Sequence, residues 1–191
     1  NSSSQKGLYK VDLNTLENTF IYPFEAVEHL YSTNENLFII QDNGEIYYPN
    51  NARELWASDG TASGTVFLQK LADDRIDHAI IFNNEFYFSA RIFDTGDNAL
   101  YKSDGTFEGT YTLHIGNIPV TTYPRFDNLV SCENYLFFGL ENTYDAVVQL
   151  WRTDGTVEGT IPIITEQEGV FNYISELECF NGNLVFNQSV D

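Results

Sequence analysis

Short runs rich in aromatic and β-branched residues, separated by turn-forming residues, recur along the whole chain. In one stretch of the sequence they fall at about 76–82, 86–91, 99–103 and 110–115. Runs of this length and composition are typical of β-strands. Two further runs open the chain, at about 7–13 and 18–23, and two close it, at about 173–180 and 183–188. The pattern predicts an all-β protein.

The strand candidates belong to an internal repeat. A motif of the form Leu-Trp/Tyr-x-Ser/Thr-Asp-Gly-Thr-x-x-Gly-Thr occurs at 55–65, 100–110 and 150–160, and a shortened copy begins at Leu8. A second, unrelated signature of apolar residues has the same spacing, and its copies begin at Leu37, Phe86, Leu136 and Leu184. Two independent signatures with one period of 45–50 residues indicate a true structural repeat.

Four short strands in a period of this length are the signature of a β-propeller blade. We expect three complete blades, at about 26–70, 76–115 and 126–165. The two strands of 7–23 and the two of 173–188 are expected to pair with each other as a further blade. This pairing would close a four-bladed ring in one domain, 1–191, and would remove open sheet edges. A β-sandwich of duplicated hairpins is the alternative.

The segment from Glu54 to Thr61, followed by Gly64 and Thr65, resembles the ELWxTDGTxxGT repeats of bacterial secreted and surface proteins. The resemblance covers most of the chain through its three good copies. It implies an exported β-propeller, often one part of a longer polypeptide, and no shared catalytic residue. The absence of methionine is in keeping with a processed or excised domain. The copy at 8–13 departs from the pattern because it lacks Gly-Thr.

The repeated polar residues favour a structural interpretation over a metal loop. Asp-Gly between two strands is a hairpin signal, in which glycine supplies a positive φ and aspartate accepts hydrogen bonds from nearby backbone N–H groups. Pro162 falls in an expected outermost strand, where a missing N–H is tolerated. Large aromatic residues at the second motif position are expected to fill the space between blades. These residues are Trp56, Tyr101 and Trp151.

Charge narrows the classes of partner. The chain has 28 Asp and Glu against 9 Lys and Arg, a formal net charge of −19. Nucleic acids and anionic membranes are excluded, because their phosphates require cationic groups. A cation, a neutral glycan or a basic protein remains acceptable. The two cysteines, Cys132 and Cys179, are too few for a disulfide framework, and a single bridge between them is left open.

Acidic residues recur at one position of the expected innermost strands. Glu28, Asp77 and Asp127 would converge on a central channel, with Ser175 as the fourth member. Carboxylate oxygens of this kind suit calcium or another hard cation. Ion pairs of the aspartates with Arg75 and Arg125 are the competing explanation.

Two histidines lie beside these acids. His29 and His78 occupy the same repeat position, and the other copies have Asn128 and Glu176 there. Zinc binding or acid–base chemistry is one interpretation of the two histidines, and a hydrogen-bonded scaffold is the favoured one.

The loops after the second strand of each blade vary most between copies, so functional variety is expected there. Tyrosines beside carboxylates can stack on sugar rings and accept hydroxyl hydrogen bonds, or can contact a protein. The candidate ligand-binding residues of this loop face are Asp42, Glu45, Tyr47, Tyr48, Asp94, Asp97, Tyr144 and Asp145.

The sequence therefore favours a non-enzymatic, lectin-like binding or adhesion module of a secreted or cell-surface bacterial protein, with a glycan or protein partner and no membrane insertion. The first alternative is a structural propeller unit of a larger polypeptide, stabilised by a central cation. The second is a glycoside hydrolase or lyase that uses paired carboxylates.

Overall fold

The computed structural model describes residues 5–43, 52–72, 76, 78–95, 97–113, 125–142, 147–164 and 173–189. Calls that rest on other residues, including Asp77, Glu45, Tyr47, Tyr48, Tyr144 and Asp145, lie outside the described part of the chain. Within that part the protein forms sixteen strands in five separate antiparallel sheets, and the expected all-β class is confirmed. No helix of the described residues is long and apolar enough to cross a membrane.

Three of the sheets have four strands each, and neighbours in sequence are neighbours in the sheet. The first full sheet consists of β3 (Val27–Ser32), β4 (Leu37–Asp42), β5 (Arg53–Ser58) and β6 (Val66–Leu71). The second consists of β7 (Ala79–Phe82), β8 (Glu85–Arg91), β9 (Asn98–Ser103) and β10 (Tyr111–Leu113). The third consists of β11 (Arg125–Cys132), β12 (Tyr135–Asn142), β13 (Val147–Thr153) and β14 (Ile161–Ile164). Pro162 lies in β14, which among the described strands pairs only with β13, so the expected edge position is confirmed.

The two remaining sheets have two strands each. The N-terminal half-sheet consists of β1 (Leu8–Val11) and β2 (Asn18–Tyr22). The C-terminal half-sheet consists of β15 (Tyr173–Phe180) and β16 (Asn183–Ser189). All four of these terminal strands were expected from the sequence.

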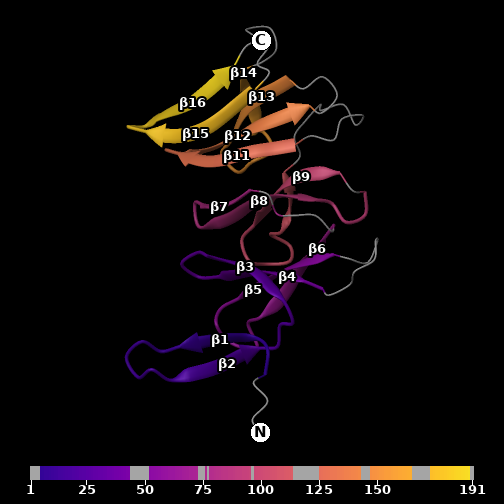
Figure 1. Cartoon of the computed structure of the whole chain (residues 1–191), viewed down its shortest axis with the longest axis vertical. Helices are drawn as coiled ribbons and strands as arrows, with labels where there is room; N and C mark the ends of the chain where they lie inside the picture. The colour runs from indigo at the N-terminus through magenta and orange to yellow at the C-terminus, as the bar shows by residue number, and fades with distance from the viewer. Residues whose placement is uncertain are drawn as a thin grey trace.

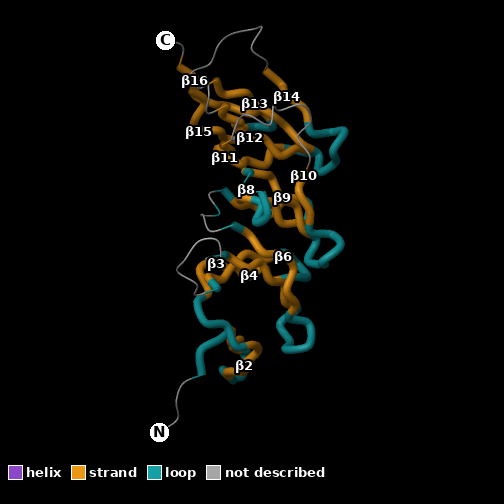
Figure 2. Tube along the Cα trace, turned by 90° about the vertical axis from the view of Figure 1, so that its right-hand side faces the viewer, coloured by secondary structure: helices purple, strands orange, loops and turns teal. Residues whose placement is uncertain are grey.

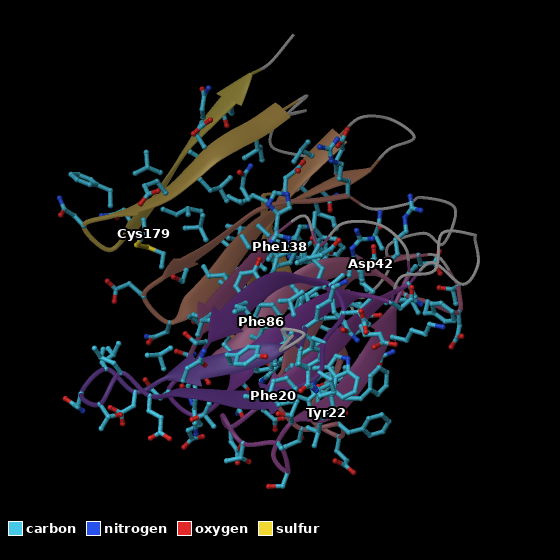
Figure 3. All side chains as sticks on the ribbon, turned by 60° about the horizontal axis from the view of Figure 1, so that its bottom comes forward. Phe20, Tyr22, Asp42, Phe86, Phe138 and Cys179 are labelled. Carbon is cyan, nitrogen blue, oxygen red and sulfur yellow. A yellow bond between two sulfur atoms is a disulfide. The ribbon has the colours of Figure 1, made fainter. Side chains whose placement is uncertain are left out.

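The sheets stack face to face, because alternate side chains of each second strand point to opposite neighbours. In β8, Phe86 and Phe88 pack against the first full sheet, whereas Tyr87 packs against the third. All three side chains are fully buried. Figure 3 shows Phe86 and Phe138 in the interior of this stack. Every hydrophobic cluster thus joins two consecutive sheets.

Among the described residues, the two half-sheets do not pair, so the expected closure into a four-bladed ring is not observed. The stack is elongated, and the N-terminal half-sheet lies at one end and the C-terminal half-sheet at the other (Figure 1). A view turned by a right angle shows the same separation (Figure 2). The described core clusters supply the physical reason: each joins a sheet only to the next one along the chain, so these contacts do not draw the two ends together.

The first strand of a sheet is irregular in a recurring way. The pairing register shifts after Val27 in β3, after Asp127 in β11 and after Ser175 in β15. In β11 and β15 the shift contains a residue with positive φ, at Asn128 and Glu176, both at 54°. Bulges of this kind re-aim side chains and end regular pairing, which makes this position of the repeat a place for special contacts.

Candidate functional site

The Asp-Gly-Thr turns are closed networks of internal hydrogen bonds. In the second full sheet the Asp104 carboxylate accepts hydrogen bonds from the N–H and the hydroxyl of Thr106, both at 2.8 Å. The Thr106 hydroxyl in turn accepts the N–H of Gly109 at 2.9 Å. The turns that begin at Asp59 and Asp154 have the same bonds. The structural interpretation of the motif is therefore confirmed.

These bonds also explain both glycines of the motif. Gly105 has a φ of +94°, a conformation that favours glycine. Gly109 has an ordinary φ, but a Cβ there would overlap the Asp104 carboxylate. Hydrogen bonds from the threonine hydroxyl and N–H also lower the pKa of the Asp59 and Asp154 carboxyl groups.

The aromatic residues at the second motif position lie between sheets, as expected. Trp56 contacts Tyr22 and Phe24, with ring centroids 5.5 Å apart in both pairs, and so joins the first full sheet to the N-terminal half-sheet. Tyr101 is buried in the cluster shared by the first and second full sheets. Trp151 is buried in the cluster shared by the second and third.

A hollow of about 420 Å³ lies beside the bulge of β3 and is lined by Glu28, His29, Arg53 and Ile76. The Glu28 carboxylate accepts two hydrogen bonds from the Arg53 guanidinium, from Nε at 2.7 Å and from the second terminal nitrogen at 2.9 Å. Such a forked pair holds both groups in one orientation. Both side chains remain partly accessible, and Ile76 adds an apolar surface that packs against the core.

Asp127, at the same repeat position two sheets later, binds different partners. His78, the residue before β7, has its Nε2 3.4 Å from Asp127 Oδ1, and Arg125 Nε lies 3.6 Å from the same oxygen. The hydrogen bond from His78, and then the charge of Arg125, lower the pKa of the Asp127 carboxyl group against the opposing effect of burial. This contact ties two neighbouring sheets together, in keeping with the scaffold role favoured for His78.

The expected cation site is not assembled among the described residues. Glu28 and Asp127 each face an arginine, and Asp77 lies outside the described part of the chain. Because the two half-sheets do not pair in the described part of the chain, the ring that was expected to bring these positions together is not formed there. No cluster of three His, Cys, Asp or Glu side chains suited to a metal ion occurs among the residues that the structure describes. The three-carboxylate site stays a prediction.

Of the expected loop face, Asp42, Asp94 and Asp97 are described. Asp42 ends β4 and lies opposite Arg53 of the hollow in the ladder of β4 and β5. Arg53 pairs with Leu71 on its other side, and Leu71 bridges to Ile92 in the loop that contains Asp94 and Asp97. The structure therefore brings this part of the loop face to the same end of the strands as the hollow. Burial, and then the charge of Asp94, raise the pKa of Tyr101 to about 12.

The structure decides the question that the sequence left open about the cysteines. A disulfide joins Cys132, the last residue of β11, to Cys179 near the end of β15 (Figure 3). It links the third full sheet to the C-terminal half-sheet and is consistent with an oxidising, extracellular location. A signal was present in the sequence, since both cysteines fall at the end of the first strand in consecutive repeats.

The partnership of Glu28 with Arg53 had no such signal. The expected arginine partners, Arg75 and Arg125, are close to their aspartates in sequence, whereas Arg53 is on the third strand of the sheet.

Comparisons of the chain with protein families, curated proteins and solved structures give no match.

Proposed function

We propose that this chain is a non-enzymatic binding module of an exported protein, and that it binds a neutral glycan or a protein through the loop face next to the hollow of Glu28, His29, Arg53 and Ile76. The observation that carries the proposal is the hollow itself, in which a paired carboxylate and guanidinium stand beside an apolar side chain. Arg53 of its lining lies opposite Asp42 in the ladder of β4 and β5, at the end of β4 where a variable loop begins.

The chemistry of the lining favours a glycan with neutral rings. A carboxylate accepts hydrogen bonds from sugar hydroxyls, a guanidinium donates them, and an apolar or imidazole surface contacts the C–H face of the ring. The ion pair fixes both polar groups before a ligand arrives, which lowers the cost of ordering on binding. The net charge of −19 disfavours acidic sugars over neutral ones.

Two further features support export. The disulfide requires an oxidising environment to persist. The repeats resemble those of bacterial secreted and surface proteins, and the stack of meander sheets is compatible with an open, propeller-type arrangement within a larger polypeptide.

A screen of neutral and acidic glycans, followed by calorimetry on the best ligand, tests the proposal. Glu28→Gln is expected to weaken binding about tenfold or more, because a hydrogen bond to a charged group contributes roughly 1.5–3 kcal/mol. His29→Ala is expected to weaken it as well, because it removes the imidazole surface that contacts the sugar ring. His78→Ala is the matched control, since it occupies the same repeat position outside the hollow. Equal losses in all three variants, or no neutral ligand in the screen, would contradict this site.

A second candidate is a structural unit stabilised by a hard cation at Glu28, Asp77 and Asp127. The recurrence of an acidic residue at this position of the repeat is the observation behind it, and in the structure Glu28 and Asp127 each face an arginine. Calcium is then expected to raise the melting temperature and a chelator to lower it, because a ligand bound only by the folded state stabilises that state. A melting temperature that ignores both additions removes this candidate.

A further inference from the structure

One side of the stack is formed by the Asp-Gly-Thr turns and by the start of the fourth strand that follows each turn. The turns before β6, β10 and β14 lie one above another along this side (Figure 2). Each of these strands begins with an apolar residue that pairs with the equivalent residue of the third strand, and these residues are Val66, Tyr111 and Ile161. We call the surface formed by residues 59–66, 104–111 and 154–161 the turn ladder.

Large apolar side chains of the turn ladder are open to solvent in the sheets that have a neighbour on both faces. Val66 and Tyr111 are each 42% exposed, and Phe107, which follows Asp-Gly-Thr in the second turn, is 64% exposed. The first full sheet lies between the N-terminal half-sheet and the second full sheet, and the second lies between the first and the third. The exposure of these three residues therefore comes from their position at the outer rim and does not depend on either end of the chain.

The turn itself does not require an apolar residue at its tip. The hydrogen bonds that close the second turn are made by Asp104, Thr106 and Gly109. The first turn makes the same bonds with Ala62 at the position of Phe107. A fully formed aromatic ring at a turn tip, with a second exposed apolar residue four positions later, is typical of an interaction surface.

The turn ladder is also acidic. Phe107 and Val157 are each followed by an exposed glutamate, Glu108 and Glu158. An exposed aspartate opens each of the three turns, at Asp59, Asp104 and Asp154. A partner for this surface must therefore bring basic groups together with apolar ones. A second copy of the chain is disfavoured, because two molecules with a net charge of −19 repel each other.

The lysine opposite Tyr111 in the sheet does not neutralise this surface. Lys102 Nζ lies 2.9 Å from the Glu85 carboxylate and donates a hydrogen bond to the carbonyl of Gly155 at 3.2 Å. Its side chain is mostly buried, at 15% exposure. The glutamates at the turn tips therefore remain available to cations of a partner.

The spacing of the sheets selects the shape of that partner. Stacked sheets lie about 10 Å apart face to face, so equivalent residues of successive sheets recur at about this distance. Residues seven positions apart on an α-helix lie on nearly the same face, about 10.5 Å from each other. Residues on one face of an extended strand recur at about 6.7 Å and then about 13 Å. A helix that runs along the stack therefore matches successive sheets better than an extended segment does.

We propose that the turn ladder binds a basic amphipathic helix of a partner protein, which lies along the stack. One apolar residue in every two helical turns contacts Val66, Tyr111 and Ile161 in succession, and lysine or arginine side chains flank this stripe beside Glu108 and Glu158. Three contacts of this kind span about 20 Å, the length of about 14 helical residues. Recognition of this kind places the apolar face of a helix on an apolar surface with a charged rim.

The turn ladder and the hollow lie at opposite ends of the strands. The third strand β5 runs from Arg53, which lines the hollow, to Ser58, which precedes the first turn. A helix on the turn ladder therefore leaves the hollow open, and the two binding surfaces are independent.

Synthetic peptides test the shape of the partner. The probe is a labelled, alanine-rich peptide of 21 residues with leucines at every seventh position and lysines flanking the leucine stripe. The control peptide has the same composition with its leucines five positions apart, which turns successive leucines about 140° around the helix. At 0.15 M salt we expect the probe to bind at least about tenfold more tightly than the control in fluorescence anisotropy, because only the probe buries all its leucines on one surface. Equal binding of the two peptides, or no binding of the probe, overturns the proposal.

Substitutions in the protein test the location. Phe107→Ser is expected to weaken binding of the probe about tenfold, because the exposed ring is buried in the complex. Phe180→Ser is the matched control, since Phe180 is also 64% exposed but lies at the hairpin of β15 and β16. Tyr111→Ser is a second variant with an expected loss of similar size. Losses no larger than that of Phe180→Ser in both variants overturn the proposal.

Charge reversal separates local contacts from general attraction. Glu108→Lys/Glu158→Lys is expected to weaken binding of the probe about tenfold, whereas Glu25→Lys/Glu178→Lys, which has the same net charge, should weaken it less than about threefold. Equal losses in the two double variants overturn the proposal, because they show that only the overall charge attracts the peptide. Glycan binding by Phe107→Ser should be unchanged, so failure at the turn ladder and failure at the hollow are distinguishable.

Discussion

The disulfide between Cys132 and Cys179 should decide whether the C-terminal half-sheet stays docked. It crosslinks positions 47 residues apart, on the first strands of two neighbouring sheets. Among the described residues, Ile174 and Leu177 also hold the half-sheet by apolar contacts with Val148 and Leu150. The partly buried side chains of Val130, Phe137, Leu184 and Phe186 pack against the same cluster. These contacts cover only one of its faces, whereas each full sheet is covered on both.

The size of the effect follows from the loop that the bond closes. In the chain-entropy treatment, closing a loop of 47 residues raises the free energy of the unfolded state by about 4 kcal/mol near room temperature. Because the half-sheet is a terminal unit of a stack, the stability lost on removing the disulfide should be lost mainly from β15 and β16. We expect the double variant Cys132→Ala/Cys179→Ala to show an early unfolding step of this region, before the other sheets unfold.

Urea titration combined with hydrogen exchange of the amides measures this step. The oxidised wild type is compared with the reduced wild type and with the double variant, whose stability should not respond to reductant. Equal amide protection of β15 and β16 in all three states would refute the reasoning, because it would mean that apolar contacts alone dock the half-sheet.

The remaining predictions concern the turn, an inter-sheet contact and the core. Gly109→Ala should lower the free energy of unfolding by roughly 1–3 kcal/mol, because the new Cβ overlaps the Asp104 carboxylate. Asp104→Ala should cost less in the Gly109→Ala background than in the wild type, and a double-mutant cycle in urea measures this difference. Asp127→Asn should cost about 1 kcal/mol at neutral pH, where the carboxylate accepts the hydrogen bond from His78. Folding lowers the pKa of Asp127, so the stability that its carboxylate contributes is present above the ordinary pKa of 3.8 and is lost as the pH falls through the lower pKa of the folded state. Stability curves of wild type and variant should therefore converge in acid. A difference in stability that does not depend on pH would contradict this cause. Phe138→Ala should cost about 3–5 kcal/mol in thermal or urea unfolding, because the fully buried ring fills space between the second and third full sheets, and a loss below about 1 kcal/mol would show that neighbours close the cavity.

The sequence alone determined the local structure of this protein. The strands, the edge position of Pro162 and the hydrogen bonds of Asp104 in its turn all follow from side-chain period and turn chemistry, which act over a few residues. The repeat also determined which faces are apolar. Trp56, Tyr101 and Trp151 therefore lie between sheets as expected.

Only the tertiary structure decided how the repeats combine. The strand pattern is the same for an open stack and a closed ring, since each repeat encodes contacts with its neighbours and not the relation between the two ends of the chain. The pairing of Glu28 with Arg53 depends on strands that flank a third one, and the disulfide depends on the packing of successive sheets. Contacts of this range are set by three-dimensional register, which no local pattern of residues specifies.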